Sequence, residues 1–178
     1  GKKLYKKLWE KICSISRDEY QIVYDTLNID NLLVRGESFY QDLCPKVVKD
    51  FKAKGLLTES QGARCVFLPT FTQKDGRPLP LIIQKSDGGY NYTTTDLAAL
   101  KQRMQIESAS SVIYVTDLGQ KLHFDMLFAA GGAVGYITDQ VSVEHVGFGL
   151  VLGKDGKKLK TRSGETLPLI DLLQGAIE

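Results

Sequence analysis

Apolar side chains recur at helical spacing through the first part of the chain. They share one face while lysines occupy much of the remaining surface, which predicts an amphipathic helix. The apolar positions are Leu4, Tyr5, Leu8, Trp9 and Ile12. A capping-box spacing between Ser16 and Glu19 predicts that a second helix begins there, so we expect a helix pair. The lysine run is more typical of a solvated helix face than of a nucleic-acid patch.

A third helix and a β-hairpin are predicted next. Apolar positions within 47–51 share a helical face, and Gly55 lies where a glycine commonly ends a helix. Two apolar runs at 65–68 and 79–83 are separated by 74–78, which contains an Asp-Gly step. Because Asp-Gly favours a tight turn, these two runs predict an antiparallel hairpin.

From residue 85 onward, glycine-rich turns alternate with helices and bare apolar strands. This alternation is typical of a parallel sheet with crossover helices, so we expect an α/β fold. The predicted order is a helix carrying Leu97, Leu100 and Met104, a strand at 112–116 buried on both faces, a helix carrying Phe124, Leu127, Phe128 and Val134, a strand at 143–152, and a final helix opened by Pro168.

Composition narrows the class of protein. The chain has 178 residues, 43% hydrophobic and 25% charged, which is typical of one globular domain with or without an appendage. Its apolar runs are far shorter than the roughly 18 residues that span a bilayer, so we expect no membrane association. A net charge of +2 does not by itself indicate nucleic-acid binding. Cys13, Cys44 and Cys65 form no Cys-x-x-Cys pair, which predicts reduced thiols, no metal site and a cytoplasmic location.

The segment 88–96 concentrates polar groups ahead of a predicted helix. It holds two glycines, two tyrosines, three threonines and a carboxylate within nine residues. In one interpretation, Thr93 caps the helix and Asp96 stabilises the positive end of its dipole. In the other, Tyr92 and Asp96 project into a shared crevice where the carboxylate receives a cationic ligand. The sequence pattern leaves both interpretations open.

Further candidates follow the predicted strands. Gln120 and His123 come just after the strand at 112–116, where ligands bind in open α/β sheets. A lone histidine is more often structural than functional, and this applies to His123 and His145 alike. Glycines at 147–153 lead into no helix, which argues against a dinucleotide fingerprint. We expect there either a strand bulge or a strand whose backbone contacts a flat ligand.

A cationic loop precedes the last predicted helix. Residues 154–162 contain five lysine and arginine side chains, with glycines and hydroxyl groups beside them. Such a loop can close over a polyphosphate and neutralise its charge. A solvated turn accounts equally well for the same composition.

Several ordered motifs over residues 35–178 together resemble arginyl-tRNA synthetases, class I enzymes that join arginine to tRNA through an adenylate. The motifs are Arg35-Gly36-Glu37-Ser38-Phe39-Tyr40, Lys85-Ser86-Asp87-Gly88-Gly89-Tyr90, Thr94-Thr95-Asp96-Leu97-Ala98-Ala99, Gly119-Gln120-x-x-His123-Phe124, His145-Val146-Gly147-Phe148-Gly149 and Lys160-Thr161-Arg162-Ser163-Gly164-Glu165-Thr166. The resemblance implies that 85–178 form the C-terminal half of a Rossmann-like catalytic domain. Residues 1–84 would then form connecting helices and a mostly helical insertion with a β-hairpin.

The resemblance also implies roles for individual residues. Positions that hold the substrate arginine are matched by Tyr92, Asp96 and Gln120, with Asp96 pairing with the guanidinium. Positions near the adenine and ribose of ATP are matched by His123, Val146, Gly147 and Phe148. The loop that stabilises the departing pyrophosphate, known as KMSKS, is matched by Lys157, Lys158, Lys160 and Arg162, and the alignment leaves open which cation assists catalysis. ATP would enter with Mg²⁺, and no tightly bound metal is implied.

The expected function is therefore that of a ligase that activates arginine with ATP and transfers it to tRNA. The sequence has no His-Ile-Gly-His-like segment, so we expect a catalytic-domain fragment without the first half of the fold and without the anticodon-binding domain. Such a fragment is expected to be inactive alone. The alternative is a non-catalytic module that only binds ligands or partners. Because half a sheet exposes an unpaired strand edge, we also expect a partner, a domain swap or a dimer to cover it.

Overall fold

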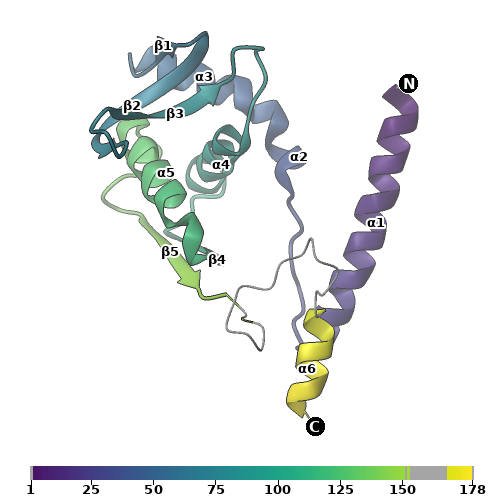
Figure 1. Ribbon diagram of the computed structural model, residues 1–178. Helices are drawn as coiled ribbons and strands as arrows, with labels where there is room; N and C mark the ends of the chain where they lie inside the picture. Colours follow the sequence, from purple (N-terminus) through teal and green to yellow (C-terminus); the bar gives the residue numbers. More distant parts are fainter. Residues whose placement is uncertain (1, 151, 153–167, 178) are drawn as a thin grey trace. The chain divides into compact units, whose positions relative to one another are not determined.

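The structure is a computed structural model that describes residues 2–150, 152 and 168–177. The chain divides into two compact units (Figure 1). One unit is Arg35–Leu150, and the other combines Gly1–Val34 with Val151–Glu178. No helix of the described residues combines the length and the apolar character needed to cross a membrane.

Helices and short strands alternate in the unit Arg35–Leu150. Its helical elements are α2 (Glu37–Tyr40), η1 (Gln41–Leu43), α3 (Cys44–Ala53), α4 (Tyr92–Lys101), the π-helical η2 (Gln102–Ile106), η3 (Leu118–Gln120) and α5 (Lys121–Val134). Its strands are β1 (Thr58–Ser60), β2 (Ala63–Thr72), β3 (Pro78–Gln84), β4 (Ser111–Asp117) and β5 (Ser142–Phe148). The other unit contains α1 (Lys2–Thr26) and α6 (Leu169–Ile177), the latter in the place predicted after Pro168.

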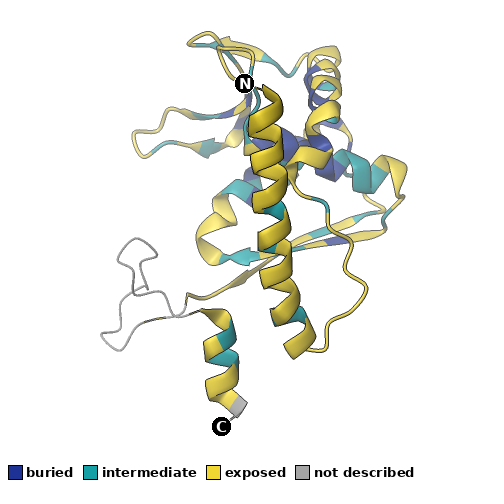
Figure 2. Cartoon of the chain, turned by 90° about the vertical axis from the view of Figure 1, so that its right-hand side faces the viewer, coloured by how far each residue is buried: buried dark blue, intermediate teal, exposed yellow. Residues whose placement is uncertain are grey.

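Helix α1 corrects the predicted helix pair. It runs without interruption from Lys2 to Thr26, so Ser16 and Glu19 lie inside a helix and not at its start. Neither glycine nor proline occurs within this range, and the two internal serines, Ser14 and Ser16, cost too little to end a helix. None of its residues is buried, and Figure 2 shows the helix exposed along its length.

The predicted hairpin is confirmed and carries one additional strand. Strands β2 and β3 pair antiparallel, and β1 pairs with the other edge of β2. In the turn, the Gln73 amide donates to the Arg77 carbonyl at 2.7 Å, and Gly76 adopts φ +80°. A side chain rarely tolerates that φ, which explains the glycine of the Asp-Gly step. The sequence Thr-Glu-Ser of β1 has no apolar alternation, so its pattern did not predict a strand.

A single hydrophobic core lies between the three-stranded sheet and the helices. Helix α3 forms as predicted and is followed by Gly55 at φ +68°. Figure 1 shows α4 and α5 between this sheet and strands β4 and β5. Fully buried side chains come from the three-stranded sheet and from α3, α4 and α5, among them Val47, Phe51, Val66, Ile83, Leu97, Leu100 and Leu127.

Strands β4 and β5 form the predicted parallel pair, but β4 is not buried on both faces. Its inner side chain Tyr114 packs on Phe124 and Phe128, with ring centroids 4.9 and 5.5 Å apart. The outward side chains Ile113 and Val115 are 59% and 63% exposed. This sheet has two strands, and helices cover only its inner face within the described residues. Strand β5 ends at Phe148, before the predicted limit of 152.

Packing between α4 and α5 depends on a glycine. A Cβ atom on Gly131 would lie 2.6 Å from Cδ2 of the fully buried Leu100, whereas nothing lies within 4 Å of a Cβ on the next residue, Gly132. Gly131→Ala should lower the free energy of unfolding by about 1 to 3 kcal/mol because the core is overpacked. Gly132→Ala should raise it by about 0.5 to 1 kcal/mol through helix propensity. Urea unfolding of both variants measures this contrast, and equal effects would contradict the packing argument.

A polar cluster ties three elements of this unit together. The Asp50 carboxylate accepts hydrogen bonds from Lys101 Nζ and from the Tyr136 hydroxyl, the latter at 2.7 Å. Burial alone raises the pKa of Asp50, but these two hydrogen bonds outweigh burial and hold the pKa below its usual value. The lowered pKa means that the ionised cluster stabilises the fold.

Asp50→Asn should therefore lower the free energy of unfolding by about 1 to 2 kcal/mol at pH 7, the pair being partly exposed. A carboxyl whose pKa is lower in the folded state adds to the free energy of unfolding at any pH above its unfolded pKa of about 3.9. This stabilisation is lost as pH falls through the folded pKa. The difference in free energy of unfolding between the wild type and Asp50→Asn, measured by denaturation, should thus become smaller below about pH 4. Asp125→Asn, which removes an exposed pair with Lys121, is the control and should change stability by less than about 0.5 kcal/mol. A difference between wild type and Asp50→Asn that does not change with pH would contradict the stabilising role of the ionised Asp50.

Candidate active site

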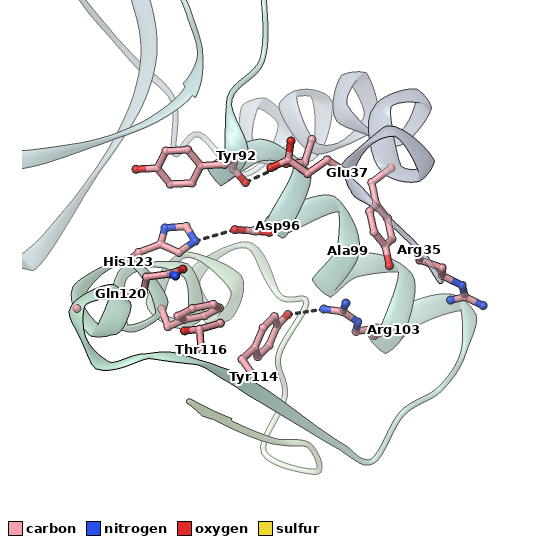
Figure 3. Close-up of a pocket in the computed structure, with 14 residues that line it drawn as sticks. Arg35, Glu37, Tyr92, Asp96, Ala99, Arg103, Tyr114, Thr116, Gln120 and His123 are labelled. Atoms are coloured by element: carbon pink, nitrogen blue, oxygen red, sulfur yellow. Dashed lines mark hydrogen bonds and ion pairs between the residues drawn. The ribbon is translucent and has the colours of Figure 1, made fainter. Parts of the chain in front are cut away.

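A cavity of about 630 Å³ lies within the unit Arg35–Leu150 (Figure 3). Its walls come from α2 and the residues before it, from α4 and η2, from the end of β4, and from η3 with the start of α5. The lining residues are Arg35, Glu37, Tyr40, Tyr92, Thr95, Asp96, Ala99, Arg103, Tyr114, Thr116, Gly119, Gln120, His123 and Phe124. The three residues that matched arginine-binding positions, Tyr92, Asp96 and Gln120, therefore meet in one cavity.

Helix α4 places one of its faces in this cavity. Tyr92, Asp96, Ala99 and Arg103 follow one another at intervals of three or four residues, and all four line the cavity. The opposite face carries Leu97 and Ala98, which are fully buried in the core. Helical periodicity therefore separates the residues that can contact a ligand from those that hold the helix.

The start of α4 settles how the helix is capped. Its N-cap is Asn91, whose side chain accepts a hydrogen bond from the Thr94 amide at 3.4 Å. The predicted cap at Thr93 is wrong, since Thr93 lies inside the helix. Asp96 consequently falls in the second turn, beyond the region where the helix dipole acts strongly. Of the two interpretations of Asp96, the structure favours the one that places its carboxylate in a crevice.

Asp96 and His123 are in direct contact across the cavity wall. His123 Nε2 lies 2.7 Å from Asp96 Oδ2, and Figure 3 shows the pair between α4 and α5. The Tyr92 ring meets the His123 ring edge to face at a centroid distance of 5.0 Å. The two side chains are 15% and 34% exposed for His123 and Asp96, so both remain accessible from the cavity.

Gln120 is held by the carboxylate that ends β4. Its Nε2 atom donates to Asp117 Oδ2 at 2.8 Å, and the Gly119 amide donates to Asp117 Oδ1 at 3.0 Å. A Cβ atom on Gly119 would approach Asp117 Oδ1 to 2.8 Å, so the tight turn favours glycine. This network leaves the Gln120 side-chain oxygen available as an acceptor, because the bond to Asp117 uses the amide nitrogen.

The other end of the cavity carries two arginines that the sequence analysis did not single out as ligand-binding. Arg103 donates to the Tyr114 hydroxyl at 3.0 Å and lies over its ring at 5.1 Å. Arg35 forms an ion pair with Glu107, and the hydrogen bond from Arg35 lowers the pKa of this carboxyl. Burial raises the pKa of the Tyr114 hydroxyl, although Arg103 opposes that effect.

Several other lining residues were also missed, and the pattern contained a signal for most of them. Arg103 follows Tyr92 by eleven residues, which places it about three turns further along the same helix face. Tyr114 and Thr116 alternate along one face of β4, as strand periodicity requires. Glu37 and Tyr40 belong to the first motif of the resemblance, but only the tertiary structure brings that motif to α4.

Strand β5 runs beside this site without lining the cavity. In the parallel register, Gly147 pairs with Thr116 and Phe148 pairs with Asp117. That register is continuous, so the strand bulge, one of the two predicted alternatives, is absent from β5. A Cβ atom on Gly147 would lie 2.7 Å from Leu118 Cδ1, which shows that this glycine permits the close approach of η3. Val146 and Phe148 are 44% and 54% exposed.

The remaining candidates are His145, which has structural contacts, and the cations of the predicted pyrophosphate loop. His145 Nε2 lies 2.8 Å from the Thr116 hydroxyl, and its ring stacks on Phe124 at 4.6 Å. These contacts agree with the structural role predicted for His145. The cations of the predicted pyrophosphate loop, Lys157, Lys158, Lys160 and Arg162, lie outside the described residues. Among the residues that are described, no cluster of histidine, cysteine and acidic side chains could hold a metal ion.

Comparison with known proteins identifies the family. The entire chain, residues 1–178, matches the family described as class I tRNA synthetases (R), catalytic domain. The chain belongs to the class I arginyl-tRNA synthetase family. The arginine–tRNA ligase of Nostoc sp. (strain PCC 7120) is 56% identical over 169 residues, covering 95% of this chain and 29% of the relative. That of Thermosynechococcus vestitus is 55% identical over 99% of this chain and 30% of the relative.

Solved structures of the family support the same conclusion. The arginyl-tRNA synthetase of Plasmodium falciparum superposes with a TM-score of 0.74 and 36% identity, over 97% of this chain and 29% of that one. A putative arginyl-tRNA synthetase from Campylobacter jejuni, at 18% identity and a TM-score of 0.65, supports the fold. This synthetase chain thus spans less than a third of the length of the relatives that it matches.

Proposed function

We propose that this chain is part of an arginine–tRNA ligase, which activates arginine with ATP and transfers it to tRNA. The observation that carries the proposal is the position of Asp96 in the second turn of α4, facing a cavity that Tyr92 and Gln120 share. In this proposal residues 85–178 supply the C-terminal half of the Rossmann-like catalytic domain, and 1–84 supply the connecting helices and the insertion.

Asp96 gives the cavity its selectivity for arginine. A guanidinium is planar and offers donors in a fork that a carboxylate accepts at two points, whereas a lysine ammonium is a compact point charge. The Tyr92 ring shapes the wall beside the carboxylate, and the Gln120 oxygen can accept from the amino group of the substrate. A free guanidinium approaching from the cavity would meet Asp96 at a side chain that is 34% exposed.

ATP and its Mg²⁺ would occupy the neighbouring end of β5. The backbone of Val146, Gly147 and Phe148 is the proposed contact for the adenine and ribose, with His123 as the fourth residue that the family resemblance implies. Lys157, Lys158, Lys160 and Arg162 are proposed to neutralise charge on the departing pyrophosphate. Catalysis would then rest on positioning of the arginine carboxylate and on electrostatic stabilisation of in-line attack at the α-phosphate.

The complete enzyme is proposed to bind tRNA. The two-stranded sheet of β4 and β5 is proposed to be covered by another part of the synthetase or by a second copy of the chain. The exposed apolar side chains Ile113 and Val115 on the outer face of β4 support such a covering element. Translation enzymes of this class act in the cytoplasm, and that location is proposed here as well.

Asp96→Asn in a full-length synthetase containing this chain should raise the Michaelis constant for arginine at least about 100-fold. Removing one member of a desolvated charge pair leaves the other charge unpaired, at a cost of about 3 to 5 kcal/mol. The Michaelis constant for ATP should stay within about twofold, because Asp96 is proposed to contact only the amino acid. ATP–pyrophosphate exchange in the presence of tRNA measures both constants.

The matched control for this experiment is Asp125→Asn. Asp125 lies on α5, where it pairs with Lys121 on the surface, and it does not line the cavity. This variant should retain both Michaelis constants. Unchanged arginine kinetics in Asp96→Asn would refute the proposed arginine pocket.

A non-catalytic module that only binds ligands or partners is the second candidate, because the cavity beside Asp96 accounts for binding without a catalytic step. The 178-residue chain alone should show no ATP–pyrophosphate exchange with arginine and tRNA, while the full-length enzyme does. This outcome is expected because the described cavity belongs to the proposed second half of the fold. Exchange by the isolated chain at the rate of a complete synthetase would contradict it.

A further inference from the structure

We propose that His123 is a positioning residue for arginine recognition, which orients the Asp96 carboxylate and makes arginine binding compete with a proton. This inference rests on the proposed function and deepens it. It also moves His123 from the ATP side, where the family resemblance placed it, to the arginine side of the site. The observation behind it is the direct contact between His123 Nε2 and Asp96 Oδ2 at 2.7 Å.

The contact fixes the carboxylate from a second helix. Asp96 projects from α4 and His123 from the first turn of α5, so the hydrogen bond spans two elements of the same core. It holds Oδ2 and thereby sets the rotation of the carboxylate plane. The substrate guanidinium is then assigned to Oδ1 and to the remaining lone pair of Oδ2, since each carboxylate oxygen accepts two hydrogen bonds.

Aromatic rings restrain the imidazole in this position. The Tyr92 ring meets the His123 ring at 5.0 Å with an interplanar angle of 69°, and Phe124 meets it at 5.0 Å and 66°. With its side chain 15% exposed, His123 has little freedom to turn away from Asp96. A ring held in this way presents the same nitrogen to the carboxylate in every enzyme molecule.

The protonation state of His123 then decides how well Asp96 receives arginine. A neutral imidazole donates through Nε2–H and leaves the negative charge of the carboxylate for the substrate. A protonated imidazole is itself a cation on that carboxylate, and it repels the arginine guanidinium, which stays charged at any pH of interest. Arginine and a proton at His123 therefore exclude one another, and arginine affinity falls as pH falls. One linked proton limits the effect to about tenfold per pH unit.

The other charged and titratable groups around the pair do not produce this dependence. The cavity lining contributes arginines, a glutamate and tyrosines but no second histidine, and burial raises the pKa of the Tyr114 hydroxyl. These groups are Arg35, Glu37, Tyr40, Tyr92, Arg103 and Tyr114. The second histidine of the chain, His145, contacts Thr116 and Phe124, not Asp96.

The test compares His123→Leu and His123→Gln in the full-length synthetase, with Michaelis constants for arginine and ATP measured by pyrophosphate exchange from pH 6 to 8.5. His123→Leu should raise the constant for arginine about tenfold at pH 8 and leave that for ATP within about twofold, because it removes a hydrogen bond to a charged group. His123→Gln restores an N–H donor without a titrating ring. It should recover most of the arginine affinity, and its Michaelis constant for arginine should not rise toward low pH as that of the wild type is expected to do.

Two controls accompany these variants. Lys121→Gln changes an exposed side chain two residues away on α5 and should behave as the wild type. His145→Gln removes the other imidazole of the chain and should retain the pH dependence. Thermal unfolding identifies a variant that fails to fold, in which case the pH profile of His123→Gln alone decides the inference.

Three results would overturn the inference. A raised Michaelis constant for ATP with an unchanged one for arginine would return His123 to the ATP side. Wild-type arginine kinetics in His123→Leu would show that Asp96 needs no second residue to orient it. A pH dependence that persists in His123→Gln would assign the linked proton to another group.

The Asp96→Asn variant separates this inference from the proposed function. If Asp96→Asn raises the Michaelis constant for arginine while the His123 variants do not, this inference fails and the proposed function stands. If Asp96→Asn has no effect, the proposed function itself fails.

Discussion

Helix α4 has to satisfy two environments at once, and the site depends on how it does so. One face enters the hydrophobic core through the fully buried Leu97 and Ala98, and the other lines the cavity with Asp96 and Arg103. A helix that rotated to improve either contact would spoil the other, because the two faces are rigidly linked by the 3.6-residue repeat. The rotation of α4 is therefore the constraint from which the position of the Asp96 carboxylate follows.

Local hydrogen bonds fix that rotation at the start of the helix. Asn91 caps the first turn, and the Thr94 hydroxyl donates to the Ile83 carbonyl at 2.6 Å, which ties the helix to strand β3. Thr94 is completely buried, so this bond is made where water cannot replace it. The distance to α5 is set further along by Gly131, which allows Leu100 to approach. Packing in the core and the contact between Asp96 and His123 are consequently coupled, since the same pair of helices makes both.

The sequence predicted those features that depend on local pattern. Helices α3 to α6, the β2–β3 hairpin and the parallel pairing of the later strands all follow from periodicity, from Gly55 and from the Asp-Gly turn. The errors arose where a local signal was ambiguous. The Ser16–Glu19 spacing occurs inside an uninterrupted helix, and Asn91 took the capping position expected of Thr93, two residues further on. The exposed outer face of β4 was not predicted, because a run of apolar residues does not indicate which element covers each face of a strand.

The candidate site shows the same division between local and tertiary information. Tyr92, Asp96 and Gln120 came from motifs and meet in the cavity as expected, but their partners are distant in sequence. The contact between Asp96 and His123 spans 27 residues. No local pattern specifies it, because it requires the packing of α4 on α5. The family resemblance places the same histidine beside ATP, whereas the structure shows it in contact with Asp96, and both roles of His123 stay proposals.

The charge balance of the cavity is compatible with the proposed binding of a third guanidinium beside the two arginines of the lining. Arg35 is engaged by Glu107, and Arg103 is engaged by the hydroxyl and the ring of Tyr114. Each of these side chains thus has an acceptor at its own end of the cavity. Asp96 lies at the opposite end, next to a histidine whose charge can vary with pH. If that histidine is neutral, Asp96 makes its end of the cavity anionic, and this is the end where the proposed guanidinium binds.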